Sequence, residues 1–339
     1  MSFTKPTLDD ADWAVPFGRL IDLAEGPARR NFVRNGDFQF ARRGTSFAGL
    51  TTDQYTLEGW IAGAGGTNTV SQQSFTVGQT DVPGNPRNYL RVVRSGAAAA
   101  DNTICSHRIE HPDRLAGRTV TVGFWAKVAT GTKALVLDFN SSGVTSAVDT
   151  SDEAITVSSN WAYYEKTITL PTMTAVTAAA YLALRIREAA SFATFTFDLA
   201  DVQVEIGSEG TLFERLEYGD AMRWQQRFLN MSFKAGTAPA QNAGGGTGEI
   251  LFTAGKAGAA NQYATVRYPV AMRATPATIT YYSPSAASAQ VYDADAAAGC
   301  TATATALSTE DGFSLSCTGN ASTAVGNQLK FHYLATAEL

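Results

Sequence analysis

The sequence predicts an all-β protein, in which an antiparallel β-sandwich is followed by a connecting helix and a smaller β-domain. Two observations lead to this fold class. Between residues 31 and 206, apolar and polar side chains alternate along short segments, and Gly, Asn, Asp and Ser clusters separate these segments. No helical pattern of about 10 to 15 residues lies between the segments, which disfavours a parallel α/β sheet.

Alternation is clearest from Val120 to Val128, where every second residue is apolar and therefore shares one face of a strand. The segment 182–186 repeats this pattern. In the last segment of the region the parity changes near Ala200 and Asp201, and one extra residue there, a β-bulge, would keep the apolar side chains facing inward. Further strands are predicted at 89–93, 134–139 and 163–170.

The first thirty residues form a leader whose pattern differs from that of the strand-rich region after it. Apolar residues from Phe17 to Ala24 lie at helical spacing, and Gly26-Pro27 ends the pattern. Two interpretations stay open for residues 1–30. The leader packs as a strap on the domain behind it, or it anchors the chain to neighbouring subunits.

Three further segments complete the predicted organisation. Residues 31–210 form the sandwich, 211–234 the connecting helix and 235–339 the smaller domain. The helix is expected to be capped by Asp220 and to place Trp224 on its apolar face. Strands of the smaller domain are predicted after a flexible glycine-rich loop, at 249–253, 264–270, 277–282, 313–317 and 329–335.

Composition narrows the function classes. Hydrophobic residues make up 45% of the 339 residues and charged residues 17%, with a net charge of −5. A chain with this negative net charge lacks the basic surface that attracts nucleic acid, so nucleic-acid binding is not predicted. Apolar runs are too short for membrane insertion, and the first thirty residues lack the pattern of a signal peptide, so we expect synthesis in the cytoplasm. Three cysteines cannot all pair; Cys300 and Cys317 meet across a hairpin or stay free thiols.

Motifs for catalysis are missing from the sequence, which predicts a protein that is not an enzyme. His107, His111 and His332 lie outside any metal-ligand motif, and we find no nucleophile elbow or P-loop. A glycosidase needs two carboxylates, whose separation the sequence does not reveal. The carboxylates considered for such a pair are Asp138, Asp149, Asp152, Glu153 and Glu165.

Aromatic residues are the candidates for ligand contact, because flat rings stack on sugars while amides and carboxylates bind the hydroxyls. The candidates are Trp125, Tyr55 and Trp161. Strand parity places Trp125 on the face opposite the buried Phe124. For Trp161, packing against its neighbours is the alternative to ligand contact, and Trp60 is expected to begin a core strand.

Three groups of residues resemble a known family, in the order in which the family has them. The segments 31–38 (NFVRNGDF) and 42–44 (RRG) resemble the opening of the carbohydrate-binding-module-like domains of tailed-phage fibre proteins. Residues 124–127 (FWAK) look like their central strand. The closing strand and the following helix are similar at 201–207 (DVQVEIG), 213–215 (FER), 218–219 (YG) and 226–228 (QRF). The smaller domain resembles the β-domain that ends many such fibres, through 268–276 and 331–339.

This resemblance implies a jelly-roll, carbohydrate-binding-module-like sandwich in a tail fibre or a head spike of a phage or gene transfer agent. Such subunits are commonly homotrimers on the particle surface, are assembled in the bacterial cytoplasm, and bind host capsular or cell-surface polysaccharide. Two alternatives remain: a spacer, spike-base or baseplate subunit that binds no glycan, and a polysaccharide depolymerase. The family's sugar-contacting residues vary, so no ligand site is transferred to this chain.

The resemblance also implies a structural Ca²⁺ ion, although no cofactor is required for the predicted function. Related sandwiches hold calcium with an acidic turn after the first strand and an aspartate near the last one. Asp37 matches the first position, and Asp198 or Asp201 matches the second. Six or more oxygen ligands are usual for calcium, so ordinary turn carboxylates are the alternative interpretation.

Overall fold

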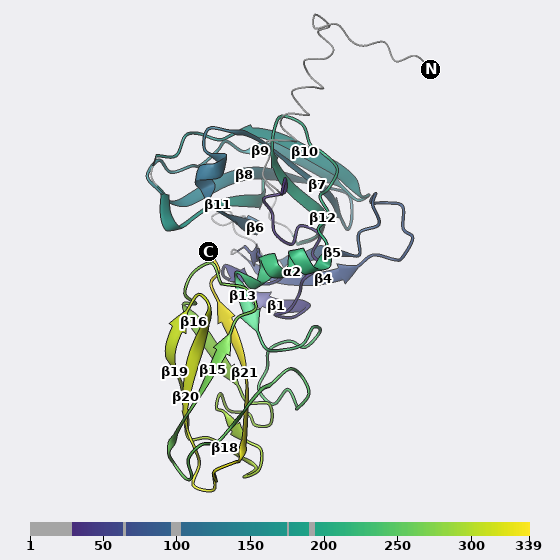
Figure 1. Cartoon of the computed structure of the whole chain (residues 1–339). Coiled ribbons are helices and arrows are strands. Elements are labelled where there is room, and N and C mark those ends of the chain that lie inside the picture. The colour runs from purple at the N-terminus through teal and green to yellow at the C-terminus, as the bar shows by residue number, and fades with distance from the viewer. Residues whose placement is uncertain (1–28, 64–65, 96–102, 175, 190–193) are drawn as a thin grey trace, which may run out of the picture.

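The computed structural model describes residues 29–63, 66–95, 103–174, 176–189 and 194–339. The predicted leader helix lies almost wholly outside these residues. Two antiparallel six-stranded sheets form the upper part of the molecule in Figure 1, and a smaller β-structure lies below them. The all-β fold class is therefore confirmed.

The first sheet, here called sheet A, will carry the candidate site. In spatial order its strands are β1 (Ser46–Leu50), β4 (Thr67–Ser74), β5 (Asn88–Ser95), β12 (Phe195–Ile206), β7 (Thr119–Val128) and β10 (Ala162–Thr169). The second, sheet B, contains β2 (Gln54–Tyr55), β3 (Trp60–Ala62), β6 (Thr103–Glu110), β11 (Val176–Glu188), β8 (Thr132–Val144) and β9 (Glu153–Ser158). From β5 to β8 and from β9 to β12 the chain alternates between the sheets, as a jelly-roll does.

Packing between the sheets follows the alternation seen in the sequence. Val120, Val122, Phe124, Ala126 and Val128 of β7 are all buried. The predicted bulge is present in β12, since the register with β7 shifts between Ala200 and Gln203 and Asp201 has a φ of 47°. Val202 and Val204 consequently stay in the same core as Phe197 and Leu199.

A short helix links the sandwich to the smaller domain. Helix α2 (Tyr218–Gln226) begins after Glu217, so the predicted cap at Asp220 was wrong. Asp220 lies in the first turn, where its carboxylate is 3.5 Å from Arg223 and favourably placed for the helix dipole. Another short helix, the 3₁₀ helix η1 (Pro112–Leu115), follows β6. None of the helices in the described ranges is both long enough and apolar enough to cross a bilayer.

Strand β21 (Gln328–Thr336) organises the smaller domain. It pairs with four other strands, β13 (Leu229–Met231), β14 (Ile250–Thr253), β16 (Thr278–Tyr282) and β17 (Tyr292–Asp293). Strand β18 (Ala298–Gly299) pairs with β17. A separate sheet contains β15 (Asn261–Arg267), β20 (Gly312–Thr318) and β19 (Ala302–Thr309). Together they enclose a second hydrophobic core, distinct from that of the sandwich.

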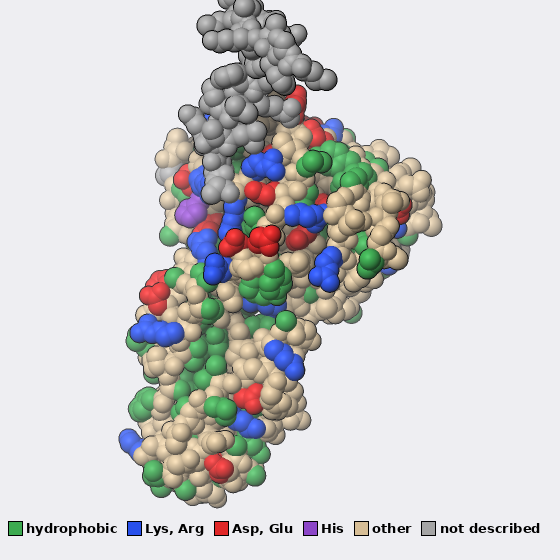
Figure 2. Space-filling model, turned by 45° about the vertical axis from the view of Figure 1, so that its right-hand side comes forward, with side chains coloured by type: hydrophobic (Ala, Val, Ile, Leu, Met, Phe, Trp, Pro, Cys, Tyr) green, Lys and Arg blue, Asp and Glu red, His purple; other side chains and the backbone are tan. Residues whose placement is uncertain are grey.

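Charged side chains join the two parts. Glu338 is 7% exposed, accepts from the guanidinium of the buried Arg34, and lies 3.0 Å from Arg43. Arg227 forms two hydrogen bonds with Glu110, at 2.9 and 3.1 Å. In Figure 2, acidic and basic side chains gather on the sandwich just above its junction with the smaller domain.

Candidate functional site

The candidate site is a cleft on the outer face of sheet A, with a volume of about 1000 Å³. Trp125 stands on its floor because residues of β7 alternate between the two faces, and Phe124 takes the buried face. Tyr163 of β10 is the register partner of Trp125, and their ring centroids are 5.8 Å apart with planes tilted by 51°. Tyr163 remains 43% exposed, so one side of this aromatic pair faces solvent.

Gly123 makes room for this arrangement. A β-carbon at Gly123 would lie 2.2 Å from the hydroxyl oxygen of Tyr163, which is far closer than a van der Waals contact. The tyrosine ring can therefore lie across the strand beside Trp125 because position 123 carries no side chain. This is a case in which glycine is required for a close approach and not for its backbone conformation.

A polar network holds the segment 210–214 as one wall of the cleft. The buried amide of Gln203 accepts a hydrogen bond from the backbone N–H of Glu214 at 2.7 Å and donates to the hydroxyl of Thr211 at 3.1 Å. The Glu205 carboxylate accepts from both the N–H and the hydroxyl of Thr211. Leu212, which is 86% exposed, and Phe213 line the cleft next to these polar groups.

Trp161 lies on the same face of the sheet but packs against its neighbours. Its ring centroid is 5.3 Å from that of Phe75 and 5.4 Å from that of Tyr89, and the ammonium of Lys127 lies 5.3 Å from the ring. Lys127 in turn lies 3.9 Å from the Asp198 carboxylate. Trp161 thus extends the aromatic surface beyond Tyr163, with its indole in contact with other side chains.

Tyr55, the third candidate aromatic, is not brought to the cleft. It belongs to β2 of sheet B, and its hydroxyl donates to the backbone carbonyl of Leu339 at 2.8 Å. Burial, together with the nearby Glu338, raises the pKa of Tyr55 to about 12. The structure therefore places Tyr55 at the junction of the sandwich and the smaller domain.

The three carboxylates predicted to hold calcium are divided between two places. Asp198 is bound by Arg91 through two hydrogen bonds, at 2.7 and 2.8 Å. Asp201 lies beside Asp37, and the Arg215 guanidinium donates to Asp201 at 2.7 Å. Burial and the neighbouring Asp37 raise the pKa of Asp201 to about 7, against the opposing effect of Arg215. Within the described ranges, no group of three or more His, Cys, Asp or Glu is placed to hold a metal ion.

The carboxylates considered for glycoside hydrolysis have structural partners. Asp138 accepts from both Arg185 and Arg187, which also bind Asp149 and Asp152 respectively. Glu153 lies 3.9 Å from Lys166. Glu165 accepts from the Tyr163 hydroxyl at 3.1 Å and from the backbone N–H of Gly210 at 3.0 Å, so it supports the wall of the cleft.

Two of the histidines are buried. The ring of His107 accepts a hydrogen bond from the backbone N–H of Arg34 at 3.3 Å, and burial lowers its pKa well below the usual value. His332 stacks on Phe233 at 4.1 Å and bonds the hydroxyl groups of Ser232 and Thr247. His111 is exposed and precedes η1. His107 and His332 are thus held inside the protein by hydrogen bonds.

Most of the cleft around Trp125 was not predicted from the sequence. The sequence holds a signal for Tyr163 as a member of this face, because it lies two residues after Trp161 and so points to the same side of the strand. Gly123, Gln203 and the wall at 210–214 carry no such signal, since they meet Trp125 through strand register and long-range hydrogen bonds.

No protein-family model matches the chain, and no curated protein matches it either. Solved structures that resemble it include the enzymatically active domain of tailspike protein 4 of bacteriophage CBA120, with 17% identity and a TM-score of 0.33. That match covers 52% of this chain and spans 21% of the tailspike chain. The CBM22-1 xylan-binding domain of Paenibacillus barcinonensis Xyn10C is 15% identical with a TM-score of 0.31, covering 49% of this chain and 98% of the domain. A family 11 carbohydrate-binding module of Clostridium thermocellum, solved with a β-1,3-1,4-mixed-linked tetrasaccharide, is 12% identical with a TM-score of 0.30. That match covers 49% of this chain and 98% of the module.

Proposed function

We propose that this protein is a non-catalytic subunit on the surface of a phage-like particle, and that the cleft of sheet A binds polysaccharide of the host cell surface. The observation that carries the binding proposal is the pair of Trp125, which is partly exposed, and Tyr163, which is 43% exposed, on the floor of the cleft. Flat aromatic rings offer an apolar surface to the faces of sugar rings.

Polar groups beside the aromatic pair suit the hydroxyl groups of a sugar. The Arg215 guanidinium lines the cleft with 38% of its side chain exposed, and Asp201 beside it has one carboxylate oxygen without a hydrogen-bond partner among the described residues. A volume of about 1000 Å³ is enough for a short oligosaccharide. The particle role is supported by the resemblance of the opening and closing segments of the sandwich to phage fibre proteins.

Weak sites gain strength through repetition, which makes the proposed homotrimer relevant to attachment. Three linked sites raise the overall affinity because the second and third binding events are intramolecular. In this proposal, residues 1–30 join the subunit to its neighbours on the particle.

Binding is tested by titrating the full chain with capsular polysaccharide and lipopolysaccharide purified from candidate hosts, while tryptophan fluorescence is followed. We expect saturable binding that falls about tenfold in Trp125→Ala and Tyr163→Ala, because a stacked ring contributes up to about 1.5 kcal/mol. Tyr263→Ala is the matched control, since Tyr263 is an exposed tyrosine of β15 in the other domain.

Light scattering and a reducing-end assay on the same samples separate the alternatives. A folded trimer that binds none of the polysaccharides would refute the attachment function and favour the spacer. New reducing ends, appearing at a rate that depends on protein concentration, would favour the depolymerase.

A further inference from the structure

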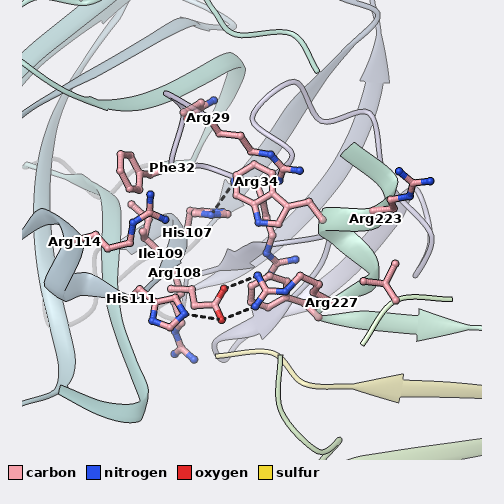
Figure 3. Close-up of a pocket in the computed structure, with 15 residues that line it drawn as sticks. Arg29, Phe32, Arg34, His107, Arg108, Ile109, His111, Arg114, Arg223 and Arg227 are labelled. Atoms are coloured by element: carbon pink, nitrogen blue, oxygen red, sulfur yellow. Dashed lines mark hydrogen bonds and ion pairs between the residues drawn. The ribbon is translucent and has the colours of Figure 1, made fainter. Parts of the chain in front are cut away.

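A second pocket, of about 430 Å³, lies where the sandwich meets helix α2 and the smaller domain. Its walls come from the segment around Arg29, from β6, from η1 and from α2 with the residues after it. Figure 3 shows Arg114 and His111 on one side of this space and Arg223 and Arg227 on the other. We call it the arginine pocket.

Its charge contrasts with that of the whole chain, which has a net charge of −5. The lining arginines are Arg29, Arg34, Arg108, Arg114, Arg223 and Arg227, whereas Glu110 is the one carboxylate that the described residues contribute to the lining. Glu110 is bound by Arg227, and Arg34 and Arg223 pair with Glu338 and Asp220, which do not line the pocket. The described lining therefore holds more guanidinium groups than carboxylates. Such a concentration of positive charge attracts an anionic group.

Two of these arginines are held by aromatic rings. The Arg29 guanidinium lies 4.7 Å from the ring of Trp224, and that of Arg114 lies 5.2 Å from the ring of Phe32. Among the residues that the structure describes, no carboxylate is paired with either arginine. A guanidinium stacked in this way keeps its N–H edge available for a carboxylate or a phosphate.

A buried donor adds independent evidence for a ligand. Arg34 is 2% exposed, and two of its nitrogens are satisfied by Gln225 and Glu338. Its Nε has no hydrogen-bond partner within the described part of the chain, although the residue lines the pocket. A buried donor without an acceptor loses the hydrogen bond that it would make in water, and an acceptor in the pocket would recover that loss.

From these contacts we infer that the arginine pocket binds an acidic sugar unit through its carboxylate or phosphate group. This site is distinct from the aromatic cleft because the two share no lining residue, although Arg29 of the pocket and Arg30 of the cleft are neighbours in the sequence. A volume of about 430 Å³ suits a single sugar unit with its anionic substituent. The arginines alone indicate an anionic group, whereas the choice of a sugar as its carrier rests on the proposed function. Binding here does not require that the cleft bind glycan.

The test titrates the full chain with glucuronate, glucose 1-phosphate and neutral glucose at low ionic strength, followed by calorimetry. We expect one or both anionic sugars to bind and neutral glucose to bind at least tenfold more weakly, because charge-assisted hydrogen bonds carry the affinity. Glucuronate binding assigns a carboxylate ligand, and glucose 1-phosphate binding assigns a phosphate ligand.

Variants decide whether the pocket is responsible. Arg114→Ala and Arg29→Ala should each weaken binding about tenfold, whereas Arg118→Ala, which removes an exposed arginine outside the pocket, should leave it unchanged. Circular dichroism checks that each variant is folded. Equal binding of glucose and the anionic sugars would overturn the inference. So would an equal loss in Arg118→Ala and Arg114→Ala, or binding of inorganic phosphate without binding of either anionic sugar.

Discussion

Replacing Glu338 by glutamine should destabilise the junction between the sandwich and the smaller domain. Glu338 is 7% exposed and lies between Arg34 and Arg43, whose side chains are 2% and 13% exposed. Without the carboxylate, the Arg34 guanidinium stays buried without a counter-charge. Removing one partner of a buried ion pair costs about 3 to 5 kcal/mol.

The lower end of this range applies here. Arg43 keeps some contact with water, and glutamine still offers one oxygen to Arg34, so we expect a loss of about 3 kcal/mol in the free energy of unfolding. That corresponds to about a 150-fold change in the folded-to-unfolded ratio. Urea unfolding, followed by fluorescence and circular dichroism, measures the loss.

The pH dependence of the free energy of unfolding provides a second test of the role of Glu338. Burial raises the pKa of Glu338, but Arg34 and Arg43 outweigh burial, so the pKa in the folded protein lies below the usual 4.5. Because the folded pKa is depressed, the carboxylate stabilises the fold above the unfolded pKa and loses this effect as the pH falls through the folded pKa. The difference between wild type and Glu338→Gln should therefore stay constant from about pH 7 down to the unfolded pKa of about 4.5, and should shrink as the pH falls below that value.

Glu153→Gln is the matched control, since Glu153 is a partly exposed carboxylate 3.9 Å from Lys166, and its replacement should change stability by less than about 0.5 kcal/mol. Equal unfolding free energies for wild type and Glu338→Gln at about pH 7 would refute the proposed role of the buried ion pair.

Three other perturbations test separate features. Gly123→Ala should displace Tyr163 and weaken polysaccharide binding about fivefold. Gly219→Ala is the control, because a β-carbon at that position meets no atom within 4 Å. Unchanged affinity in Gly123→Ala would count against the cleft as the binding site. If a calcium ion binds Asp37 and Asp201 in place of the Arg215 contact, stability should rise by about 2.7 kcal/mol at a calcium concentration about 100 times Kd. Identical melting in EDTA and CaCl₂ would contradict the calcium prediction. Mild oxidation should join Cys300 to Cys317, because their thiols lie within hydrogen-bonding reach, while Cys105 stays reduced. Peptide mapping that finds Cys105 in a disulfide would contradict this prediction.

Strand parity was enough to predict the buried face of β7, the bulge at Asp201 and the exposure of Trp125 to the outer face. These features depend on residues close together in sequence. By contrast, β19 was missed because its segment 302–309 alternates only small Ala residues with Thr and is largely exposed, so apart from Leu307 it lacks the larger apolar side chains that mark a buried face. Strands β17 and β18 have two residues each, which is too short for any periodic pattern.

Both candidate sites depend on contacts that sequence patterns do not encode. Trp125 and Tyr163 are 38 positions apart (163 minus 125), and they meet because β7 and β10 pair in one particular register. The arginine pocket draws on residues from Arg29 to Arg227, and each arginine alone is an ordinary surface residue in the sequence. The start of α2 was also misjudged, since Glu217 precedes the helix without a side-chain cap.

Strand β21 has a consequence for the order in which the smaller domain acquires its structure. Strands β13, β14, β16 and β17 share it as a common partner, although β13 precedes it by about a hundred residues. During synthesis these four strands leave the ribosome without that partner, and their backbone groups remain unpaired along that edge until residues 328–336 emerge. At about 5 to 20 residues per second this interval lasts from about five to twenty seconds for β13 and is shorter for the three later strands. A nascent chain halted before residue 328 should therefore contain a folded sandwich and an unfolded, protease-sensitive remainder.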